Sequence, residues 1–171
     1  MDRGRRMQRM TEREALREAP EAKTEPAPWD EVLNVEVTLV YTVFENLDAI
    51  IRSAKIVNCT EDAIYIKKAL SASFDIDDEN FDVITLHGSW ARERHIERHK
   101  VHLGKQGVLS VRGESSHQEH PFIALTDHNT DYNSGRVWAM NFIYSGNFVA
   151  DLQKNQFNSV RMLMGINPEN F

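Results

Sequence analysis

The 171-residue sequence is long enough for one domain, with or without a tail, and 41% of its residues are apolar, which suffices for a packed core. Its formal net charge of −6 disfavours nucleic acid and an anionic membrane surface as partners, and no run of about 18 apolar residues could span a membrane. The single cysteine, Cys59, excludes a disulfide within the chain and fits a reducing compartment, so the expected location is cytoplasmic.

Residues 1–31 differ in composition from the rest of the chain, because they are rich in Arg, Glu, Ala and Pro. Pro20, Pro26 and Pro28 favour extended backbone, and the basic start lacks the apolar segment of a secretory signal. We therefore expect residues 1–31 to be a mobile charged tail, followed by a folded domain over residues 32–171.

From Val32 onward, apolar and polar residues alternate as they do in half-buried β-strands. Every second residue is apolar over 35–43, where the sequence reads VEVTLVYTV. A turn over 46–48 leads to a second strand over 49–58, and a turn over 60–62 leads to a third over 63–74. Two hairpins in succession predict an antiparallel meander.

The next segment is a charged hairpin. Residues 75–82 predict a solvated acidic loop, since they lack the glycine and the distant glutamate of a calcium-binding EF-hand. A short apolar strand over 81–86 and a break at Gly88 precede a long charged strand over 91–101. A strand would divide its side chains into a basic face and a glutamate–histidine face. The basic face would hold Arg92, Arg94, Ile96, Arg98 and Lys100, and the other Glu93, His95, Glu97, His99 and Val101.

Further strands are expected over 104–113, 122–125, 136–144, 148–156 and 158–164, with a hairpin loop over 127–135. About ten strands at this spacing, with turn residues between them, predict an all-β fold, an antiparallel β-sandwich. The pattern contains no crossover helices, which disfavours a doubly wound or barrel fold for these residues.

The polar loop within SVRGESSHQEHPFI (residues 110–123) is the strongest candidate site. Arg112 has a planar fork of five donors, Gly113 permits an unusual backbone turn, and four polar residues that can both donate and accept hydrogen bonds follow them. These four are Ser115, Ser116, His117 and Gln118. A polar loop between strands often displays a binding site, although a solvated surface turn remains the alternative.

The sequence contains 7 histidines, which raises the question of a metal site. His95 and His99 have the spacing of a zinc-binding helix, but the surrounding residues disfavour a helix and no glutamate stands at the matching position. We therefore predict hydrogen-bonding histidines, with no metal and no cofactor.

Several motifs resemble the N-terminal domain of glycoside hydrolase family 36 α-galactosidases. They are YTVFE (41–45), GSWARERH (88–95), SVRGESSHQEHPF (110–122), YSGNF (144–148) and MGINPENF (164–171), in the family's order and with similar spacing. Two features depart from the family. His120 replaces the usual Asn before Pro-Phe, and residues 1–31 lack the family's Gly-Asp-Phe-Arg stretch and look foreign to it.

The resemblance implies a supersandwich-like, non-catalytic domain of an enzyme that hydrolyses terminal α-galactosides such as melibiose and raffinose with retention. The family's two catalytic aspartates lie on a (β/α)8 barrel of about 250 residues. Residues 1–171 contain neither that barrel nor the family's Lys-Trp-Asp stretch, so we expect no activity from this chain alone. The implied partners are the barrel, the α-galactoside and further copies of the enzyme in a homo-oligomer.

The resemblance also gives the polar residues expected roles. Arg112 would point toward the sugar pocket or its rim, or else form an interdomain salt bridge. Gly113, Ser115, Ser116, His117 and Gln118 would brace the loop, and Trp90, Arg92 and Arg94 would lie at an interdomain contact or the pocket rim. The alternative function is a stand-alone carbohydrate-binding module, in which Trp29, Trp90 and Trp138 stack on sugar rings.

Overall fold

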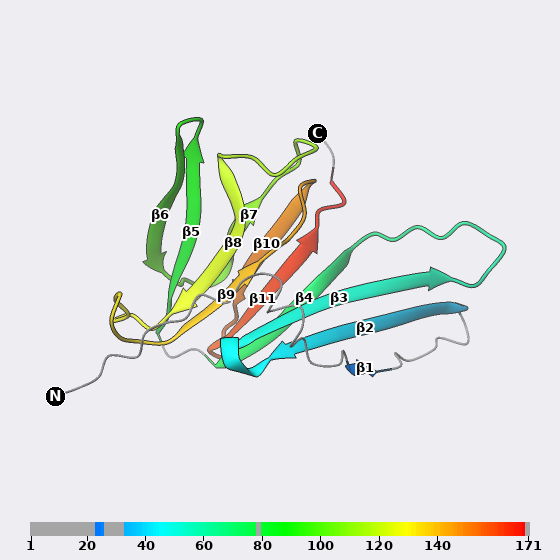
Figure 1. Cartoon of the computed structure of the whole chain (residues 1–171), viewed down its shortest axis with the longest axis horizontal. Helices are drawn as coiled ribbons and strands as arrows, with labels where there is room; N and C mark the ends of the chain where they lie inside the picture. The colour runs from blue at the N-terminus through cyan, green and yellow to red at the C-terminus, as the bar shows by residue number, and fades with distance from the viewer. Residues whose placement is uncertain (1–22, 26–32, 78–79, 170–171) are drawn as a thin grey trace. The chain divides into compact units, whose positions relative to one another are not determined.

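The computed structural model describes residues 23–25, 33–77 and 80–169 (Figure 1). The chain divides into two compact units, one ending at Ile64 and the other beginning at Tyr65. Both are built from β-strands, which confirms the all-β fold. No helix within the described ranges is long and apolar enough to cross a membrane.

The first unit is an antiparallel sheet of three strands in the order β1-β2-β3. β2 (Val35–Phe44) and β3 (Ala49–Asn58) form the predicted hairpin, joined by the 3-10 turn Glu45–Leu47 and by Asp48 in a left-handed conformation. β1 (Lys23–Glu25), which lies within the stretch expected to be a tail, pairs with residues 39–41 of β2. The rest of that stretch, and the predicted boundary at residue 32, lie outside the described residues.

The predicted third strand of a meander is wrong in both its start and its partner. β4 (Ala69–Asp77) begins at Ala69 rather than at residue 63, and it pairs with β11 (Ser159–Ile166) instead of β3. The predicted acidic loop is correspondingly shorter, since Asp75 and Asp77 belong to β4. Alternation of apolar residues identifies the face of a strand and not its neighbour, which explains the error.

The second unit contains two antiparallel sheets, with strand orders β10-β11-β4 and β6-β5-β8-β9 (Figure 1). The first sheet includes β10 (Phe148–Lys154). The second consists of β5 (Asp82–Ser89), β6 (Arg92–Lys100), β8 (Glu119–Thr126) and β9 (Val137–Asn141). β7 (Gly104–Leu109) ends earlier than the predicted strand over 104–113, because the polar loop begins at Ser110.

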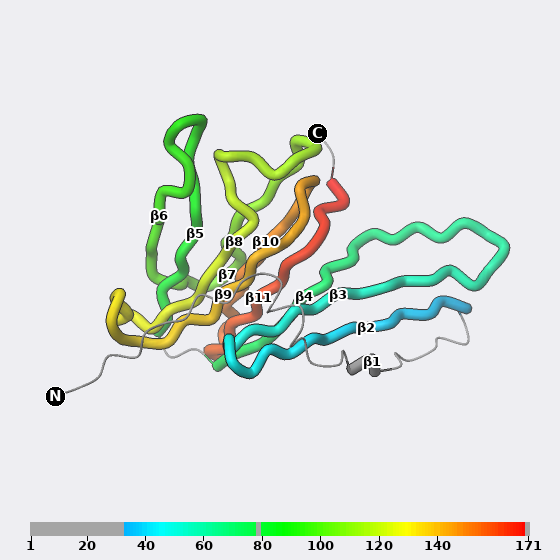
Figure 2. Tube along the Cα trace, viewed as in Figure 1, coloured from blue at the N-terminus to red at the C-terminus, as the bar shows by residue number. Residues whose placement is uncertain are grey.

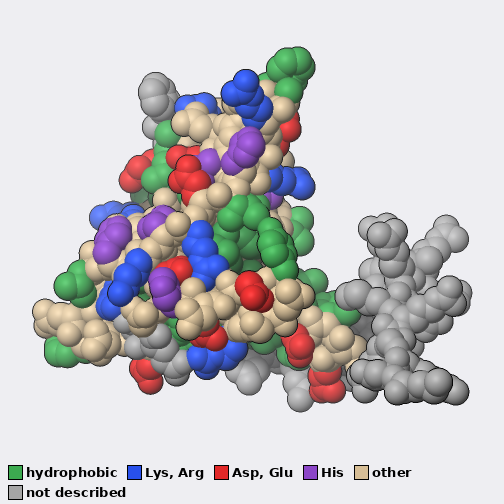
Figure 3. Space-filling view, turned by 90° about the vertical axis from the view of Figure 1, so that its left-hand side faces the viewer, with side chains coloured by type: hydrophobic (Ala, Val, Ile, Leu, Met, Phe, Trp, Pro, Cys, Tyr) green, Lys and Arg blue, Asp and Glu red, His purple; other side chains and the backbone are tan. Residues whose placement is uncertain are grey.

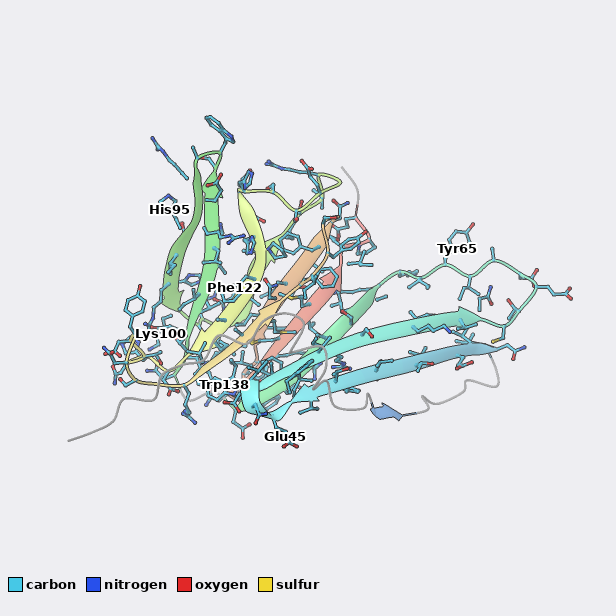
Figure 4. All side chains as sticks on the ribbon, viewed as in Figure 1. Glu45, Tyr65, His95, Lys100, Phe122 and Trp138 are labelled. Atoms are coloured by element: carbon cyan, nitrogen blue, oxygen red, sulfur yellow. The ribbon has the colours of Figure 1, made fainter. Side chains whose placement is uncertain are left out.

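Apolar side chains from both sheets meet in one core. Val83, Ile123 and Leu125 come from the four-stranded sheet, while Leu152 and Met162 come from the other. Trp138 is half-buried against Phe81, with the two rings in a T-shaped contact at 5.3 Å between centroids. Figure 4 shows Trp138 on β9 and Phe122 on β8. The core thus gives the polar loops of this unit a rigid support.

β7 lies against β10, where Leu103 forms a parallel bridge with Lys154. Gly107 makes this close approach possible, because a Cβ at this position would collide with the carbonyl oxygen of Ala150. Lys105 of β7 also forms an ion pair with the buried Asp151 of β10, with 3.0 Å between Nζ and Oδ2. These contacts fix the strand from which the polar loop departs.

The β5–β6 hairpin confirms the predicted charged strand but contains a bulge. His87 pairs with His95 and Ser89 with Arg92, so three steps along β6 match two along β5. Because paired residues share a face, Arg92 lies on the side of His95 and not on that of Arg98, which corrects the predicted basic face. Gly88 accommodates the bulge, since a Cβ there would collide with the Arg92 carbonyl.

The hairpin loop between β8 and β9 is held by Arg98. Its guanidinium donates to the carbonyl oxygens of Asp127, His128 and Thr130, at 3.0, 2.7 and 2.7 Å, and to the carboxylate of Asp82 at 2.8 Å. His128 Nδ1 lies 3.0 Å from the other oxygen of Asp82. Arg98, which was predicted to lie on the basic face, therefore stabilises the hairpin loop of the second unit.

Candidate interaction site at the polar loop

The loop over residues 110–118 connects β7 to β8 and is tied to the first residue of β10 and to the segment that precedes it. The amide of Ser110 donates to the Phe148 carbonyl at 2.9 Å, and the amide of Ser115 donates to the Ser145 carbonyl at 2.8 Å. Ser110 Oγ also donates to the Glu114 carbonyl within the loop, at 2.5 Å. The backbone on both sides of Arg112 is thus fixed.

Two buried asparagines, for which the sequence predicted no role, complete this support. Asn147 Oδ1 accepts the Gly113 amide at 2.6 Å, and its Nδ2 donates to the Glu169 carbonyl at 3.1 Å. Asn167 Nδ2 donates to the Ser110 carbonyl at 3.4 Å, and the backbone amide of Asn167 donates to the Asn147 carbonyl. Asn147 belongs to the motif YSGNF and Asn167 to the motif MGINPENF. An asparagine within each motif was therefore the sequence signal that could have pointed to a buried, hydrogen-bonded side chain.

Arg112 is exposed and lies on this braced loop. Its amide is 3.5 Å from Ser110 Oγ, and within the described ranges its guanidinium has no hydrogen bond or ion pair. A small hollow of about 180 Å³ adjoins it, lined by Leu109, Ser110, Val111, Arg112, Ser116, Gln118 and Glu119. Glu119 is already engaged, because its carboxylate accepts the Leu109 amide at 2.9 Å.

The residues predicted to brace the loop contribute mainly through their backbone. Gly113 has a φ of +84°, which glycine adopts readily, and it donates to Asn147. Ser116 Oγ accepts the Gln118 amide at 3.2 Å, and the Gln118 carbonyl accepts the Gly88 amide at 3.3 Å. The last bond joins the loop to the bulged end of the β5–β6 hairpin.

A larger hollow lies between that hairpin and the loop, and we call it the Arg94 hollow. It measures about 560 Å³ and is lined by Glu93, Arg94, Ser115, Ser116, His117 and His120. The structure therefore brings Arg94, Ser115, Ser116 and His117 together, although they come from two separate motifs. Arg112 lines the smaller hollow, and Ser116 lines both.

Trp90 and Arg92 lie at the turn of the β5–β6 hairpin. Trp90 is 85% exposed, and all 9 residues of β6 are exposed. Figure 3 shows histidines and basic side chains interspersed with acidic ones on one face of the molecule, and Figure 4 labels His95 and Lys100 along β6. This mixed surface lies on the edge strand of the four-stranded sheet.

Two titrating groups of the Arg94 hollow are perturbed. Burial, and next the positive charge of Arg94, lower the pKa of His120, so its imidazole is neutral at neutral pH. Backbone hydrogen bonds, including one from the Ala91 amide at 3.0 Å, lower the pKa of Glu93. Arg94 thus supplies the principal positive charge of the hollow.

The positions of the histidines determine whether they could bind a metal ion together. No group of three or more His, Cys, Asp or Glu residues within residues 23–25, 33–77 and 80–169 is placed to hold a metal ion. The His99 and His102 rings stack with their centroids 6.4 Å apart, and His128 contacts Asp82. These histidines take part in polar packing within the unit.

The fold and its motifs define a class of antiparallel β-sandwich domain, and comparison with known proteins identifies the family. The model of the glycosyl hydrolase family 36 N-terminal domain matches residues 13–171. This chain therefore belongs to that family. The match includes residues 13–31, which were set apart above because of their composition.

The relatives and solved structures agree with this assignment. The chain is 44% identical over 142 residues to α-galactosidase AgaA of Geobacillus stearothermophilus, covering 83% of this chain and 20% of AgaA. It is 40% identical over 142 residues to α-galactosidase 1 of Pediococcus pentosaceus, covering 83% of this chain and 19% of that protein.

The crystal structure of AgaA matches with a TM-score of 0.73 at 43% identity, covering 81% of this chain and 19% of AgaA. The Lactobacillus brevis α-galactosidase structure matches with a TM-score of 0.77 at 39% identity, with the same coverage. The chain thus spans about a fifth of the length of these relatives.

Proposed function

We propose that this chain is the non-catalytic N-terminal β-sandwich of an α-galactosidase that hydrolyses terminal α-galactosides with retention on a separate barrel. The observation that carries the proposal is the family match, in which most of this chain aligns with about a fifth of each α-galactosidase. Substituted variants of AgaA have been solved in complexes with raffinose and stachyose, which supports substrates of the raffinose type. The proposal includes the barrel as partner, a homo-oligomeric enzyme and a cytoplasmic location.

The chemistry of the site residues supports a non-catalytic role. A retaining glycosidase needs two carboxyl groups about 5–5.5 Å apart, one acting as nucleophile and one as acid and base. Here Glu93 accepts the Ala91 amide and Glu119 accepts the Leu109 amide, so both carboxylates stabilise backbone. The remaining polar side chains of the loop are suited to binding and orientation.

Within this proposal, Arg112 points toward the sugar pocket of the barrel or its rim. The loop holds its backbone rigidly, and the exposed guanidinium forms no ion pair within the described part of the chain. A rigid fork of this kind can hold two sugar hydroxyls or a neighbouring carboxylate through paired hydrogen bonds. An interdomain salt bridge is the competing role, and the two roles differ in their effect on kinetics.

The proposal is tested with the purified chain and with a hybrid enzyme. In the hybrid, which we call the AgaA hybrid, this chain's residues replace the matching segment of AgaA. We expect the chain alone to hydrolyse p-nitrophenyl α-galactoside no faster than a mock preparation, and the AgaA hybrid to be active. Hydrolysis by the chain alone, or a folded but inactive hybrid, would contradict the proposal.

A stand-alone carbohydrate-binding module is the second candidate, and the exposed Trp90 favours it. Of the other tryptophans named for stacking, Trp138 packs against Phe81 in the core, and Trp29 lies outside the described residues. Binding of galactose or raffinose to the purified chain, measured by calorimetry and abolished by Trp90→Ala, would support this alternative. Absence of binding in the wild type would exclude it for these sugars.

A further inference from the structure

The Arg94 hollow has a chemistry different from that of a sugar site. Its volume of about 560 Å³ falls in the range of clefts that admit a ligand or a protein side chain. Among the residues that the structure describes, its lining contains no Trp, Tyr or Phe on which a pyranose ring could stack. Its donors are the Arg94 guanidinium, the imidazoles of His117 and His120, and two serine hydroxyls. The lining also contains the carboxylate of Glu93, which faces the His117 side of the hollow, so the donors suit a negatively charged acceptor group at Arg94.

Arg94 is the member of this set that is free to bind. Within the described ranges it has no hydrogen bond or salt bridge, whereas Glu93 accepts the Ala91 amide and lies 3.9 Å from the His117 ring. A guanidinium binds a carboxylate through two parallel N–H···O bonds, and this geometry is the most specific that an arginine offers. A carboxylate is therefore the group that best completes the hollow.

The backbone of Arg94 gives an independent reason to assign its side chain a function. Its φ of +60° lies in the left-handed region, which Gly and Asn adopt more readily than a long side chain does. An arginine at this bulge is therefore less favourable for folding than a glycine would be. Strain of this kind at an exposed position points to a role for the side chain.

The surroundings indicate a protein as the source of the carboxylate. Trp90 at the turn of the same hairpin is 85% exposed, and Trp and Arg are among the residue types enriched at the energetic centres of protein interfaces. Asn147 binds both Gly113 of the loop and the carbonyl of Glu169, so the chain leaves the unit beside the loop (Figure 2). The relatives are about five times longer and the matched family model is that of an N-terminal domain, so a following polypeptide is available to cover this surface.

We propose that the Arg94 hollow docks a carboxylate side chain of the catalytic portion that follows this domain, with Trp90 packing beside it. The inference rests on the proposed function for the identity of the partner. The preference of the hollow for a carboxylate is a property of this chain alone and can be measured separately.

The first experiment uses the purified chain and acetate as the probe. Acetate should shift the NMR resonances of the Arg94 Nε–H and the His120 ring in the wild type, and galactose should not. In Arg94→Gly the acetate-dependent shift of His120 should disappear, while Lys67→Ala, which removes an exposed cation outside the hollow, should behave as the wild type. No response to acetate, or an unchanged His120 response in Arg94→Gly, would overturn the proposal. A comparable response to inorganic phosphate would also overturn it, as the mark of a non-selective anion site.

The second experiment compares the isolated chain with the AgaA hybrid. Arg94→Gly removes the backbone strain of an arginine in the left-handed region. Asn158→Gly does the same for a residue at the β10–β11 turn (φ +58°), so neither variant should lower the Tm of the isolated chain. In the hybrid, Arg94→Gly should lower the Tm by several degrees, whereas Asn158→Gly should not. Equal behaviour of the two variants in an active hybrid would refute the docking while leaving the proposed function intact. A folded but inactive wild-type hybrid would refute the proposed function, and the acetate result would then decide the chemistry of the hollow.

Discussion

The amide of Gly113 donates to Asn147 Oδ1 at 2.6 Å, so the residue that follows Arg112 is fixed by a side chain 34 positions further along the chain. Asn147 is buried and also binds the carbonyl of Glu169. The position of the exposed Arg112 therefore depends on a buried amide that contacts two other segments. We therefore expect replacement of Arg112 to alter function and replacement of Asn147 to alter folding.

Replacing Arg112 in the active AgaA hybrid should impair catalysis without affecting folding. Arg112→Ala should lower kcat/KM for raffinose about tenfold or more, which corresponds to roughly 1.4 kcal/mol of lost transition-state stabilisation. Its guanidinium makes no bond within the described residues, so the Tm should stay nearly unchanged. A variant that unfolds early, and whose folded fraction keeps normal kinetics, would assign Arg112 to an interdomain salt bridge instead.

Replacing Asn147 should destabilise the fold. Asn147→Ala removes an acceptor for Gly113 and a donor to Glu169, and it leaves a small void in a buried position. We expect a loss of about 1–3 kcal/mol in the free energy of unfolding, measured by urea denaturation of the purified chain. Asn133→Ala is a control, since Asn133 is an exposed residue in the hairpin loop. Equal stability of the two variants would show that the asparagine network does not stabilise the unit.

Arg98 should be required for the stability of the second unit. Within the described part of the chain, Arg98→Met leaves the buried carboxylate of Asp82 with His128 as its remaining side-chain partner, and it frees three carbonyls of the hairpin loop. Removing one member of a buried pair costs about 3–5 kcal/mol, and the partial exposure of Arg98 reduces the expected loss to about 2 kcal/mol. Arg92→Met, at an exposed position of the same strand, should have little effect on the urea midpoint.

The same pair predicts a dependence of stability on pH. Burial alone raises the pKa of Asp82, but the hydrogen bonds from His128 and Arg98 outweigh it, so the pKa lies below its usual value of 3.8. A depressed carboxyl pKa stabilises the fold above the unfolded-state value of about 3.9, and this contribution is lost as the pH falls through the folded-state value.

The difference in stability between the wild type and Asp82→Asn isolates this contribution. Asp75, Asp127 and Asp131 also have lowered pKa values, so the wild type alone would not report on Asp82. The stability difference should be present at pH 5 and should shrink below about pH 4, as Asp82 becomes protonated. A difference that stays constant down to pH 2 would contradict the assignment.

Gly107 should tolerate no side chain, in contrast to Gly104 on the same strand. Gly107→Ala would place a Cβ against the Ala150 carbonyl and force β7 away from β10, at a cost of about 1–3 kcal/mol for overpacking. Gly104 also has a positive φ, of +94°, but apart from its chain neighbours no described residue has an atom within 4 Å of the position that a Cβ would occupy there, so Gly104→Ala isolates the backbone cost. Calorimetric Tm values that fall equally for both variants would exclude the steric explanation.

The sequence by itself was sufficient to determine the strand character of most segments and the position of the polar loop. The alternation over 35–43 marked β2, and the charged run over 91–101 marked β6, because a period of two reflects the two faces of a strand. The motifs around Arg112 and Arg94 were sufficient to indicate the family. Each of these features depends on residues that are close together in the chain.

Only the tertiary structure determined which segments meet. β4 pairs with β11 rather than with its sequence neighbour β3, and a bulge places Arg92 on the other face of β6. Asn147 and Asn167 reach the loop from distant segments, and Arg94 shares a hollow with Ser115 and His120. Alternation specifies the face of a strand but not its partner or a local shift in register, and buried polar groups find their partners only when the core brings distant segments together.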